Sequence, residues 1–255
     1  MSGANILSGK VALVTGASSG LGRHFAQSLA SWGAAVAVAA RRTDALSPLA
    51  AELRARGAGA LPVALDVSNN ASIDAAVAAA ERELGPIDVL VNNSGLAIPA
   101  PVLEESAESW DRTLDTNLRG AFFMAQAVAK RMRDRKRGGS IINIASIAGL
   151  RQTTRLTSYA ASKAALIQIT QTMALELARY DIRVNAIAPG YICTDLNKDF
   201  WPTPAGEAVI KRIPQRRLGR AEDLDGVLQL LSSDASRYMT GVVIPVDGGH
   251  LVSGL

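Results

Sequence analysis

The sequence predicts an α/β fold, with a seven-stranded, mostly parallel sheet covered by helices on both faces. Short runs of β-branched and aliphatic residues alternate along the chain with longer segments of helical periodicity. Such runs are typical of strands buried on both faces, and their alternation with helices favours a doubly wound order. Hydrophobic residues make up 48% of the chain and aromatic residues only 4%. This balance suits helices packed on a sheet better than an aromatic-rich β-sandwich.

The predicted elements follow one another along all 255 residues, so we expect one domain over 1–255. The strands are expected at 11–14, 35–40, 61–65, 87–91, 140–145, 182–188 and 242–246. The helices are expected near 20–32, 44–56, 70–84, 104–137, 157–180 and 221–233. One irregular segment, 195–214, carries Leu196, Phe200 and Trp201 among several prolines. We interpret it as a lid over a substrate pocket, with a plain surface loop as the alternative.

The composition favours a soluble, cytoplasmic protein that binds neither nucleic acid, membrane nor metal. The net charge of +4 is a mild bias, and the basic run at 130–137 is expected to be the solvated end of a helix. The two histidines, His24 and His250, lie too far apart in sequence to indicate a metal site. A single cysteine, Cys193, precludes an internal disulfide. No signal peptide pattern and no apolar stretch near the roughly 20 residues of a membrane span are present.

A glycine-rich turn follows the first predicted strand. It reads Thr15-Gly16-Ala17-Ser18-Ser19-Gly20-Leu21-Gly22. Glycine permits a tight turn and a close approach of the backbone to a ligand, and a helix that starts near Gly20 would aim free N–H groups at phosphates. The turn therefore predicts the diphosphate site of a Rossmann fold. A turn without a ligand and a methyltransferase cofactor site are the alternatives.

Two arginines follow the second predicted strand, where a dinucleotide fold meets the adenosine ribose. An NAD enzyme usually carries Asp or Glu at this place. Here Ala40 is followed by Arg41 and Arg42, so no carboxylate would repel a 2′-phosphate. Guanidinium groups pair with phosphate in a planar, charge-assisted fork. We therefore expect NADP(H) to be preferred, with NAD(H) possible; two solvated arginines are the alternative.

Polar residues also end the third and fourth predicted strands. Asp66 could accept a hydrogen bond from the amino group of adenine. The run Asn92-Asn93-Ser94-Gly95 suits close packing of the backbone against a cofactor. Ordinary turn chemistry of Asn, Asp and Gly is the alternative.

A serine, a tyrosine and a lysine carry the most specific pattern. Ser146 ends the fifth predicted strand, and Tyr159 and Lys163 follow four positions apart, on one face of a helix. A phenol has a pKa near 10, and a neighbouring ammonium group favours the phenolate. Ser146 could hold a substrate oxygen by a hydrogen bond. A lone Tyr-x-x-x-Lys pair is common by chance, so its weight comes from the serine and the glycine turn.

Together these residues resemble the short-chain dehydrogenase/reductase family over nearly the whole chain, and 3-oxoacyl-carrier-protein reductase-like and ketone reductase members in particular. The resemblance rests on Thr15-Gly16-x3-Gly20-x-Gly22, Asn92-Asn93-Ser94-Gly95, Asn117, Ser146, Tyr159-x3-Lys163, Pro189-Gly190 and Thr194. It implies a hydride transfer between NADP(H) and a ketone or secondary alcohol. It also implies a homotetramer or dimer that associates through the long helices near 104–137 and 157–180.

The resemblance further implies a role for each site residue. Tyr159 would be the acid/base, Ser146 would orient the carbonyl, Lys163 would lower the tyrosine pKa and bind the nicotinamide ribose, and Asn117 would hold a water. The residues that would line the nicotinamide are Pro189, Gly190, Ile192 and Thr194, and those that would border the adenine are Asp66 and Val67. The other cofactor contacts are expected from Gly16, Ser18, Ser19, Gly20, Leu21, Gly22, Arg41, Arg42, Asn93 and Gly95, and Tyr159 and Lys163 are expected to contact the cofactor as well.

The substrate is left open by the sequence. Phe200 and Trp201 favour an apolar or aromatic ketone, whereas Arg151 and Arg155 could attract an anionic group or simply face solvent. His250 could reach the pocket of its own or a neighbouring subunit. A non-catalytic redox sensor that binds NADP(H) is the alternative function, and the complete set of four catalytic positions argues against it.

Overall fold

The computed structural model describes residues 5–194 and 197–253. Within them, seven strands form one sheet in the order β3-β2-β1-β4-β5-β6-β7. The strands are β1 (Val11–Thr15), β2 (Ala35–Ala40), β3 (Ala60–Ala64), β4 (Val89–Asn92), β5 (Gly139–Ile144), β6 (Ile182–Pro189) and β7 (Val243–Val246). Every pairing between neighbours is parallel. The predicted doubly wound α/β class is thus confirmed.

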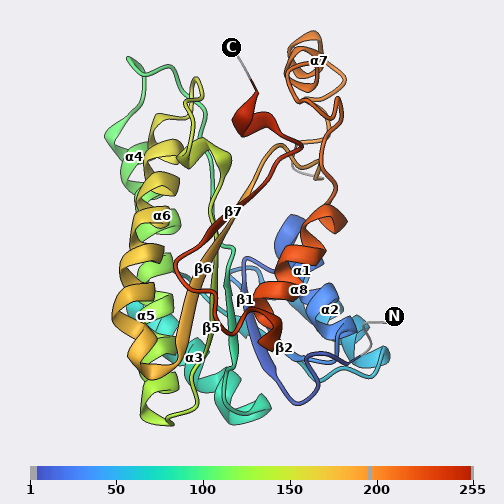
Figure 1. Cartoon of the computed structure of the whole chain (residues 1–255), viewed down its shortest axis with the longest axis vertical. Coiled ribbons are helices and arrows are strands. Elements are labelled where there is room, and N and C mark those ends of the chain that lie inside the picture. Colours follow the sequence, from blue (N-terminus) through green and yellow to red (C-terminus); the bar gives the residue numbers. More distant parts are fainter. Residues whose placement is uncertain (1–4, 195–196, 254–255) are drawn as a thin grey trace.

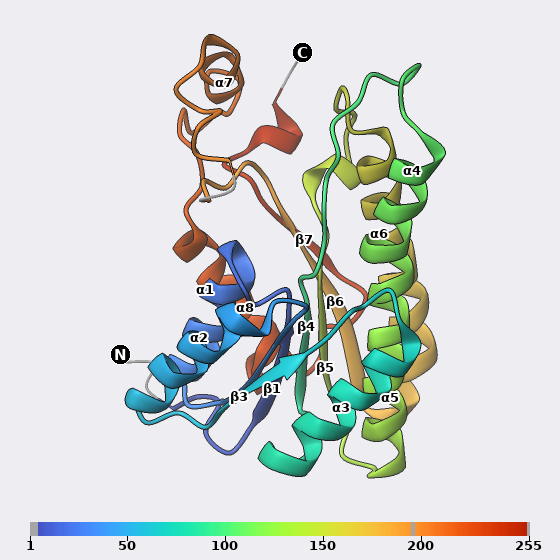
Figure 2. The same ribbon diagram turned by 180° about the vertical axis from the view of Figure 1, so that it is seen from behind.

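Helices cover both faces of this sheet, as Figures 1 and 2 show. One face carries α1 (Gly20–Ser31), α2 (Thr43–Ala55) and α8 (Asp225–Ser232), and the other carries α3 (Asn70–Leu84), α5 (Ala121–Asp134) and α6 (Thr157–Leu177). Helix α4 (Ala107–Leu114) lies against α6, and α7 (Pro204–Ile210) lies beyond the carboxyl ends of the strands. No helix in the described residues is long and apolar enough to cross a bilayer.

The alternation of side chains along each strand divides the core into two layers. Ala12 and Val14 point to the layer beneath α1 and α2, where Phe25 is fully buried. Leu13, between them, points to the layer beneath α3 and α5. Successive side chains of a strand face opposite sides of the sheet, so a strand buried on both faces must be apolar throughout. This requirement explains why the continuous apolar runs located the strands to within two residues.

The predicted helix over 104–137 is wrong as one element. The chain forms α4, then a π-helical turn at Asp115–Gly120, then α5. Gly120 lies against Val67, and a Cβ added to it would stand 2.7 Å from the Val67 carbonyl oxygen. Apolar periodicity in the sequence does not reveal a widened helical turn, because the apolar residues of the helices on either side of it still face the core.

Two further elements differ from the prediction. Residues 221–233 begin as a 3₁₀ turn at Ala221–Leu224 before α8. The irregular segment 195–214 contains α7, whose N-cap Thr203 accepts a hydrogen bond from the Gly206 N–H at 3.1 Å. Proline at the first helical position supports this start, since its missing N–H would be unpaired there. Asp195 and Leu196, the first residues of the expected lid, lie outside the described residues.

The topology places a crevice at the carboxyl ends of β1 and β4. The chain leaves β1 toward β2 and β3 and returns on the other side at β4, so the connections diverge between these two strands. In open α/β sheets, ligands bind at such a switch point. The glycine turn follows β1 and the Asn92–Gly95 run follows β4, so both predicted motifs meet there.

Candidate active site

The glycine turn after β1 adopts backbone conformations that explain its spacing. Gly16 and Gly20 have φ of +67° and +53°, in the left-handed region that favours glycine. A Cβ on Gly22 would stand 2.2 Å from the Gly16 carbonyl oxygen. A Cβ on Gly20 would meet nothing closer than Thr194 Cγ2, at 4.0 Å. The turn is therefore tightly closed on itself, with Thr194 beside the bare backbone of Gly20.

Helix α1 begins at this turn without a side-chain cap. Ser19 is the N-cap residue, its side chain accepts no capping hydrogen bond, and the first turn carries no acidic residue. The first N–H groups of a helix lack intrahelical partners and carry a partial positive charge. An uncapped helix start behind a bare glycine backbone is a fitting cradle for a diphosphate.

The arginines after β2 lie at the edge of this cradle. Arg42 Nη2 donates to Ser18 Oγ at 3.2 Å, so this guanidinium lies over the glycine turn. Ser68 accounts for most of the lowering of the Asp66 pKa, through its hydroxyl and then its N–H, and the charge of Arg41 adds to it. The structure thus brings Ser18, Arg41, Arg42 and Asp66 to one side of the crevice, as expected for residues around an adenosine.

Asn93, the residue after β4, supports the glycine turn through hydrogen bonds. Asn93 Nδ2 donates to the carbonyl oxygens of Thr15 at 3.0 Å and Gly16 at 3.4 Å. Thr15 Oγ1 in return accepts from the N–H groups of Asn93 and Ser94. Asn93 therefore reaches the cofactor site by holding the glycine turn, a role that the expectation of direct cofactor contact did not include.

Asn117 is held by the π-helical turn at the centre of the molecule. It is fully buried, and it binds the backbone of Leu96 twice at 2.8 Å, accepting from the N–H and donating to the carbonyl oxygen. Its amide also donates to Ser162 Oγ at 3.1 Å. Asn117 thereby ties the chain after Gly95 to α6. A π-helical turn inside a helix frequently marks a functional position.

Lys163 lies beside Asn117 in the same buried region. It is 4% exposed, and its Nζ donates to the Ile144 carbonyl oxygen at 2.7 Å. Burial lowers the pKa of this amine to about 8, because desolvation disfavours the charged form. A Cβ on Gly95 would stand 3.3 Å from Asn117 Oδ1 and 3.5 Å from Lys163 Nζ. Both groups therefore reach the crevice next to a bare backbone.

Tyr159 lies one helical turn before Lys163 and next to Ser146. Burial raises the pKa of the phenol, a hydrogen bond with Ser146 lowers it, and the nearby Tyr191 raises it. Lys163 Nζ lies 5.7 Å from the centre of the Tyr159 ring and is directed to Ile144. The expected lowering of the tyrosine pKa by Lys163 is not found here: Lys163 is not among the groups that shift this pKa, and burial raises it. At neutral pH the phenol is protonated and suited to donate its proton.

The segment after β6 closes the crevice opposite the glycine turn. Pro189 ends β6, and Gly190 packs so closely that a Cβ on it would stand 2.7 Å from Asp247 Cα. Ile192 is 6% exposed and its side chain belongs to the core, so the cofactor contact expected of this residue would fall to its backbone. No cluster of three or more His, Cys, Asp or Glu side chains that could hold a metal occurs in the described residues.

The family model for enoyl-(acyl carrier protein) reductase matches residues 16–250. The chain belongs to the short-chain dehydrogenase/reductase family. Its curated relatives include sorbitol dehydrogenase from Cereibacter sphaeroides, which is 42% identical over 97% of this chain and 99% of that protein. The match to the family begins at the first glycine of the turn and ends at His250, so it includes Asn117, Ser146, Tyr159 and Lys163.

Solved structures of this short-chain dehydrogenase/reductase fold superpose closely on the chain. A short-chain type dehydrogenase/reductase from Mycobacterium marinum has a TM-score of 0.91 and 42% identity, and covers 96% of each chain. A gluconate 5-dehydrogenase from Burkholderia cenocepacia, in complex with NADP and tartrate, has a TM-score of 0.94 and 35% identity over 100% of both chains. The fold of the chain is therefore that of these solved dehydrogenase/reductase structures.

Sequence reasoning singled out Trp201 and His250 but missed Tyr191 and Asn197, which join them in an aromatic rim. Tyr191 packs against Trp201 with ring centroids 5.5 Å apart and against His250 at 5.4 Å. Asn197 holds this rim, since its Oδ1 accepts from Trp201 Nε1 at 2.9 Å and from the Thr194 N–H at 2.8 Å. The sequence signal for Tyr191 was its position within the run that follows β6.

Arg151 and Arg155 do not form the anion site that the sequence allowed. Arg151 donates to the His250 carbonyl oxygen and to Ser253 Oγ, so its guanidinium anchors the C-terminal segment. Arg155 is exposed, with a φ of +63°, and its carbonyl oxygen accepts from the Ala100 N–H. The separation in sequence between these arginines and Ser146 does not predict these hydrogen-bond partners.

Proposed function

We propose that the chain is an NADP(H)-dependent oxidoreductase that transfers a hydride between nicotinamide and a ketone or secondary alcohol, with Tyr159 as the general acid/base. The observation that carries the proposal is the grouping of three side chains. The Tyr159 phenol is hydrogen-bonded with Ser146, and the Lys163 amine lies 5.7 Å from the Tyr159 ring and next to the bare backbone of Gly95. Gly95 follows β4 and the uncapped start of α1 follows β1, so both lie at the switch point of the sheet.

The residues of the chain would supply proton transfer and positioning, and the nicotinamide would supply the hydride. In reduction, negative charge builds on the carbonyl oxygen, and O–H donors fixed beside it stabilise that charge. Ser146 and Tyr159 are the two donors, and Tyr159 gives up its proton. Lys163, whose pKa of about 8 lies near neutrality, would relay a proton to the phenolate and bind the ribose. Asn117 fixes the backbone at Leu96 and the helix that carries Lys163.

The preference for NADP(H) rests on the charge around the adenosine end of the crevice. Arg42 lies over Ser18 and Arg41 lies near Asp66, and no acidic residue follows β2 until Asp44, in the first turn of α2. Two exposed guanidinium groups at this place favour a 2′-phosphate. The solved relative with bound NADP supports the same cofactor class.

The test is Tyr159→Phe, which removes the hydroxyl and keeps the ring. We expect kcat for ketone reduction to fall by about 10²–10⁴-fold, the usual contribution of general acid–base catalysis. The affinity for NADPH should stay within about twofold, because the variant keeps the Tyr159 ring and all the other expected cofactor contacts. Tyr180→Phe, a change in the turn that follows α6, is the control. Turnover of the Tyr159 variant near the wild-type level would rule out its assignment as the acid/base.

A further inference from the structure

The C-terminal segment brings a histidine with no assigned role to the aromatic rim. His250 is 8% exposed, and its Nδ1 is buried with no hydrogen-bond partner among the described residues. A ligand that meets the ring in this conformation meets it through Nε2. The imidazole packs on Tyr191, and Tyr191 lies close enough to Tyr159 to raise its pKa. His250 thus stands one aromatic ring away from the proposed proton donor.

The segment after α7 brings a second polar group to this place. The Gln215 N–H donates to the Gly248 carbonyl oxygen at 3.2 Å. A Cβ on Gly249 would stand 3.2 Å from Pro214 Cγ. These contacts hold residues 213–215 against the two glycines that precede His250. Arg212, the next residue back along the chain, is exposed and forms no ion pair among the described residues.

Charged groups of both signs surround His250. Burial lowers the pKa of the imidazole, Arg151 and Arg212 lower it further, and Asp247 raises it. The Asp247 carboxylate already accepts the N–H groups of Gly249 at 2.8 Å and Leu251 at 2.6 Å. Arg151 is engaged with the backbone of His250 and with Ser253. Arg212 is therefore the cation that remains available to a ligand beside the ring.

The protonation state and tautomer of the His250 imidazole follow from this environment. A histidine with a lowered pKa is neutral at pH 7 and carries one N–H. A buried N–H without an acceptor is a rarer and costlier defect than an unpaired acceptor, so the proton belongs on Nε2 rather than on Nδ1. The rim thus presents an N–H donor and a guanidinium group together, which is a combination suited to an oxyanion.

We propose that His250 and Arg212 form a subsite for a carboxylate at the far end of the substrate, so that the preferred substrates are hydroxy acids and their oxo acids. The subsite rests on the proposed function, because it assumes that the reacting carbon lies at Tyr159. It assigns a role in substrate specificity to a residue of the C-terminal segment and to one that follows α7. Neutral polyols and acyl thioesters would lack the partner that this end of the pocket offers.

The experiment compares D-gluconate with D-sorbitol, which differ only in a carboxylate against a hydroxymethyl group. We expect the wild-type enzyme with NADP⁺ to favour gluconate in kcat/KM. His250→Phe should lower the gluconate-to-sorbitol ratio by about tenfold, the value of one charge-assisted hydrogen bond. His250→Gln, which keeps an N–H donor, should restore part of it. Arg212→Gln should lower the ratio by about threefold, since an exposed charge contributes less.

Binding measured by calorimetry provides a second readout that does not need turnover. Gluconate and tartrate are titrated into the wild-type enzyme with and without NADP⁺, and into His250→Phe and Arg212→Gln. Arg237→Gln, an exposed arginine near the start of β7, is the matched control and should change neither binding nor the ratio. Affinity for both acids should fall in the two site variants and stay unchanged in the control.

The outcomes separate this inference from the proposed function. It is overturned if His250→Phe keeps the wild-type ratio, if gluconate has no advantage over sorbitol, or if neither acid binds the wild-type enzyme. Reduction of neutral ketones that is lost in Tyr159→Phe would leave the proposed function intact in that case. Conversely, a Tyr159→Phe variant with normal turnover would contradict the proposed function, while calorimetry would still report on the subsite.

Discussion

The role of each arginine in this chain depends on the acceptor groups that its guanidinium group contacts. Arg42 lies over the glycine turn through Ser18, whereas Arg151 holds the backbone of the C-terminal segment. Arg183, at the opposite edge of the sheet, donates to Leu231 O at 3.0 Å and to Ser236 Oγ at 2.8 Å. The planar guanidinium has five donors in a fixed fork, so its role is set by the acceptors within reach.

The cofactor preference is a property of two such residues. We expect Arg42→Ala to lower the NADP-to-NAD ratio of kcat/KM by about tenfold, because one charge-assisted contact to the 2′-phosphate is lost. Arg41→Ala should lower the ratio as well, and the double variant should lower it most. Steady-state kinetics with both cofactors and one ketone measure the effect.

Arg82→Ala serves as the control for this measurement, because Arg82 is an exposed residue of α3 that pairs with Glu83. It should leave the ratio unchanged. An unchanged ratio in the double variant of Arg41 and Arg42 would remove both arginines from cofactor recognition.

At the scale of elements, the π-helical turn between α4 and α5 decides where the centre of the site lies. It directs Asn117 inward, where the amide bonds the backbone of Leu96 and the side chain of Ser162. A buried amide whose donors and acceptor are paired stabilises a fold, and one unpaired group costs about 1–3 kcal/mol. The turn therefore fixes the loop after β4 relative to α6.

Removal of this amide should affect both stability and turnover. We expect Asn117→Ala to lower the free energy of unfolding by about 1–3 kcal/mol, because the backbone of Leu96 loses both partners. We expect kcat to fall at least about tenfold, since misplacement of Lys163 and the backbone after Gly95 disturbs the reacting geometry. Denaturant unfolding and saturating kinetics measure the two effects. Asn70→Ala, at the exposed start of α3, is the control; equal losses in both variants would contradict the interpretation.

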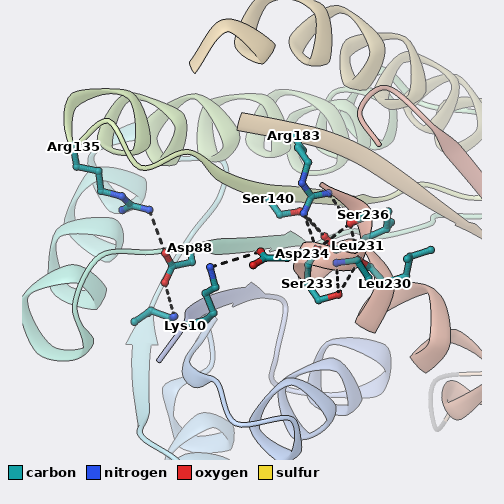
Figure 3. Close-up of polar contacts among 12 residues, drawn as sticks. Lys10, Asp88, Arg135, Ser140, Arg183, Leu230, Leu231, Ser233, Asp234 and Ser236 are labelled. Carbon is teal, nitrogen blue, oxygen red and sulfur yellow. Dashed lines mark hydrogen bonds and ion pairs between the residues drawn. The ribbon is translucent and has the colours of Figure 1, made fainter. Parts of the chain in front are cut away.

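At the scale of the whole molecule, the amino and carboxyl ends of the parallel strands have different roles. The carboxyl edge carries the crevice, while the amino edge is closed by a network of polar contacts (Figure 3). There the Val11 N–H donates to Asp88 Oδ2 at 2.9 Å, and Ser140 Oγ donates to Leu231 O at 2.7 Å. Arg183 joins β6 to the end of α8 through Leu231 and Ser233. These contacts hold the strands while leaving the opposite edge free for chemistry.

Arg183→Met should separate stability from function. We expect it to lower the free energy of unfolding by about 1.5–3 kcal/mol, because carbonyl oxygens at the end of α8 lose a charged donor. This corresponds to a Tm decrease of several degrees, at about 2–4 °C per kcal/mol for a chain of this size. Turnover of the folded enzyme at 25 °C should match the wild type. Arg237→Met is the exposed control, and a loss of turnover in Arg183→Met without a change in Tm would contradict the assignment.

Association into a homotetramer or dimer stays a prediction at this scale. Leu175, on the outer face of α6, is 82% exposed, and Tyr238, before β7, is fully exposed. Apolar side chains on two separate outer surfaces are consistent with two kinds of subunit contact.

The sequence by itself determined the strand positions, the doubly wound class and the candidate site residues, because each is written in local patterns. Strands buried on both faces must be apolar throughout, and Gly16, Gly20 and Gly22 stand where the backbone admits no side chain or requires a positive φ. Tyr159 and Lys163 share a helix, so their separation in sequence gives their separation in space.

Only the tertiary structure decided the contacts that join distant parts of the chain. The π-helical turn under Asn117, the hydrogen bonds of Arg151 to the C-terminal segment and the meeting of Tyr191 with His250 all depend on packing between segments. The pKa of Tyr159 likewise follows from burial, which no neighbour in sequence supplies. The physical reason is that partners of a side chain are chosen by topology, and apolar periodicity records only which face of an element is buried.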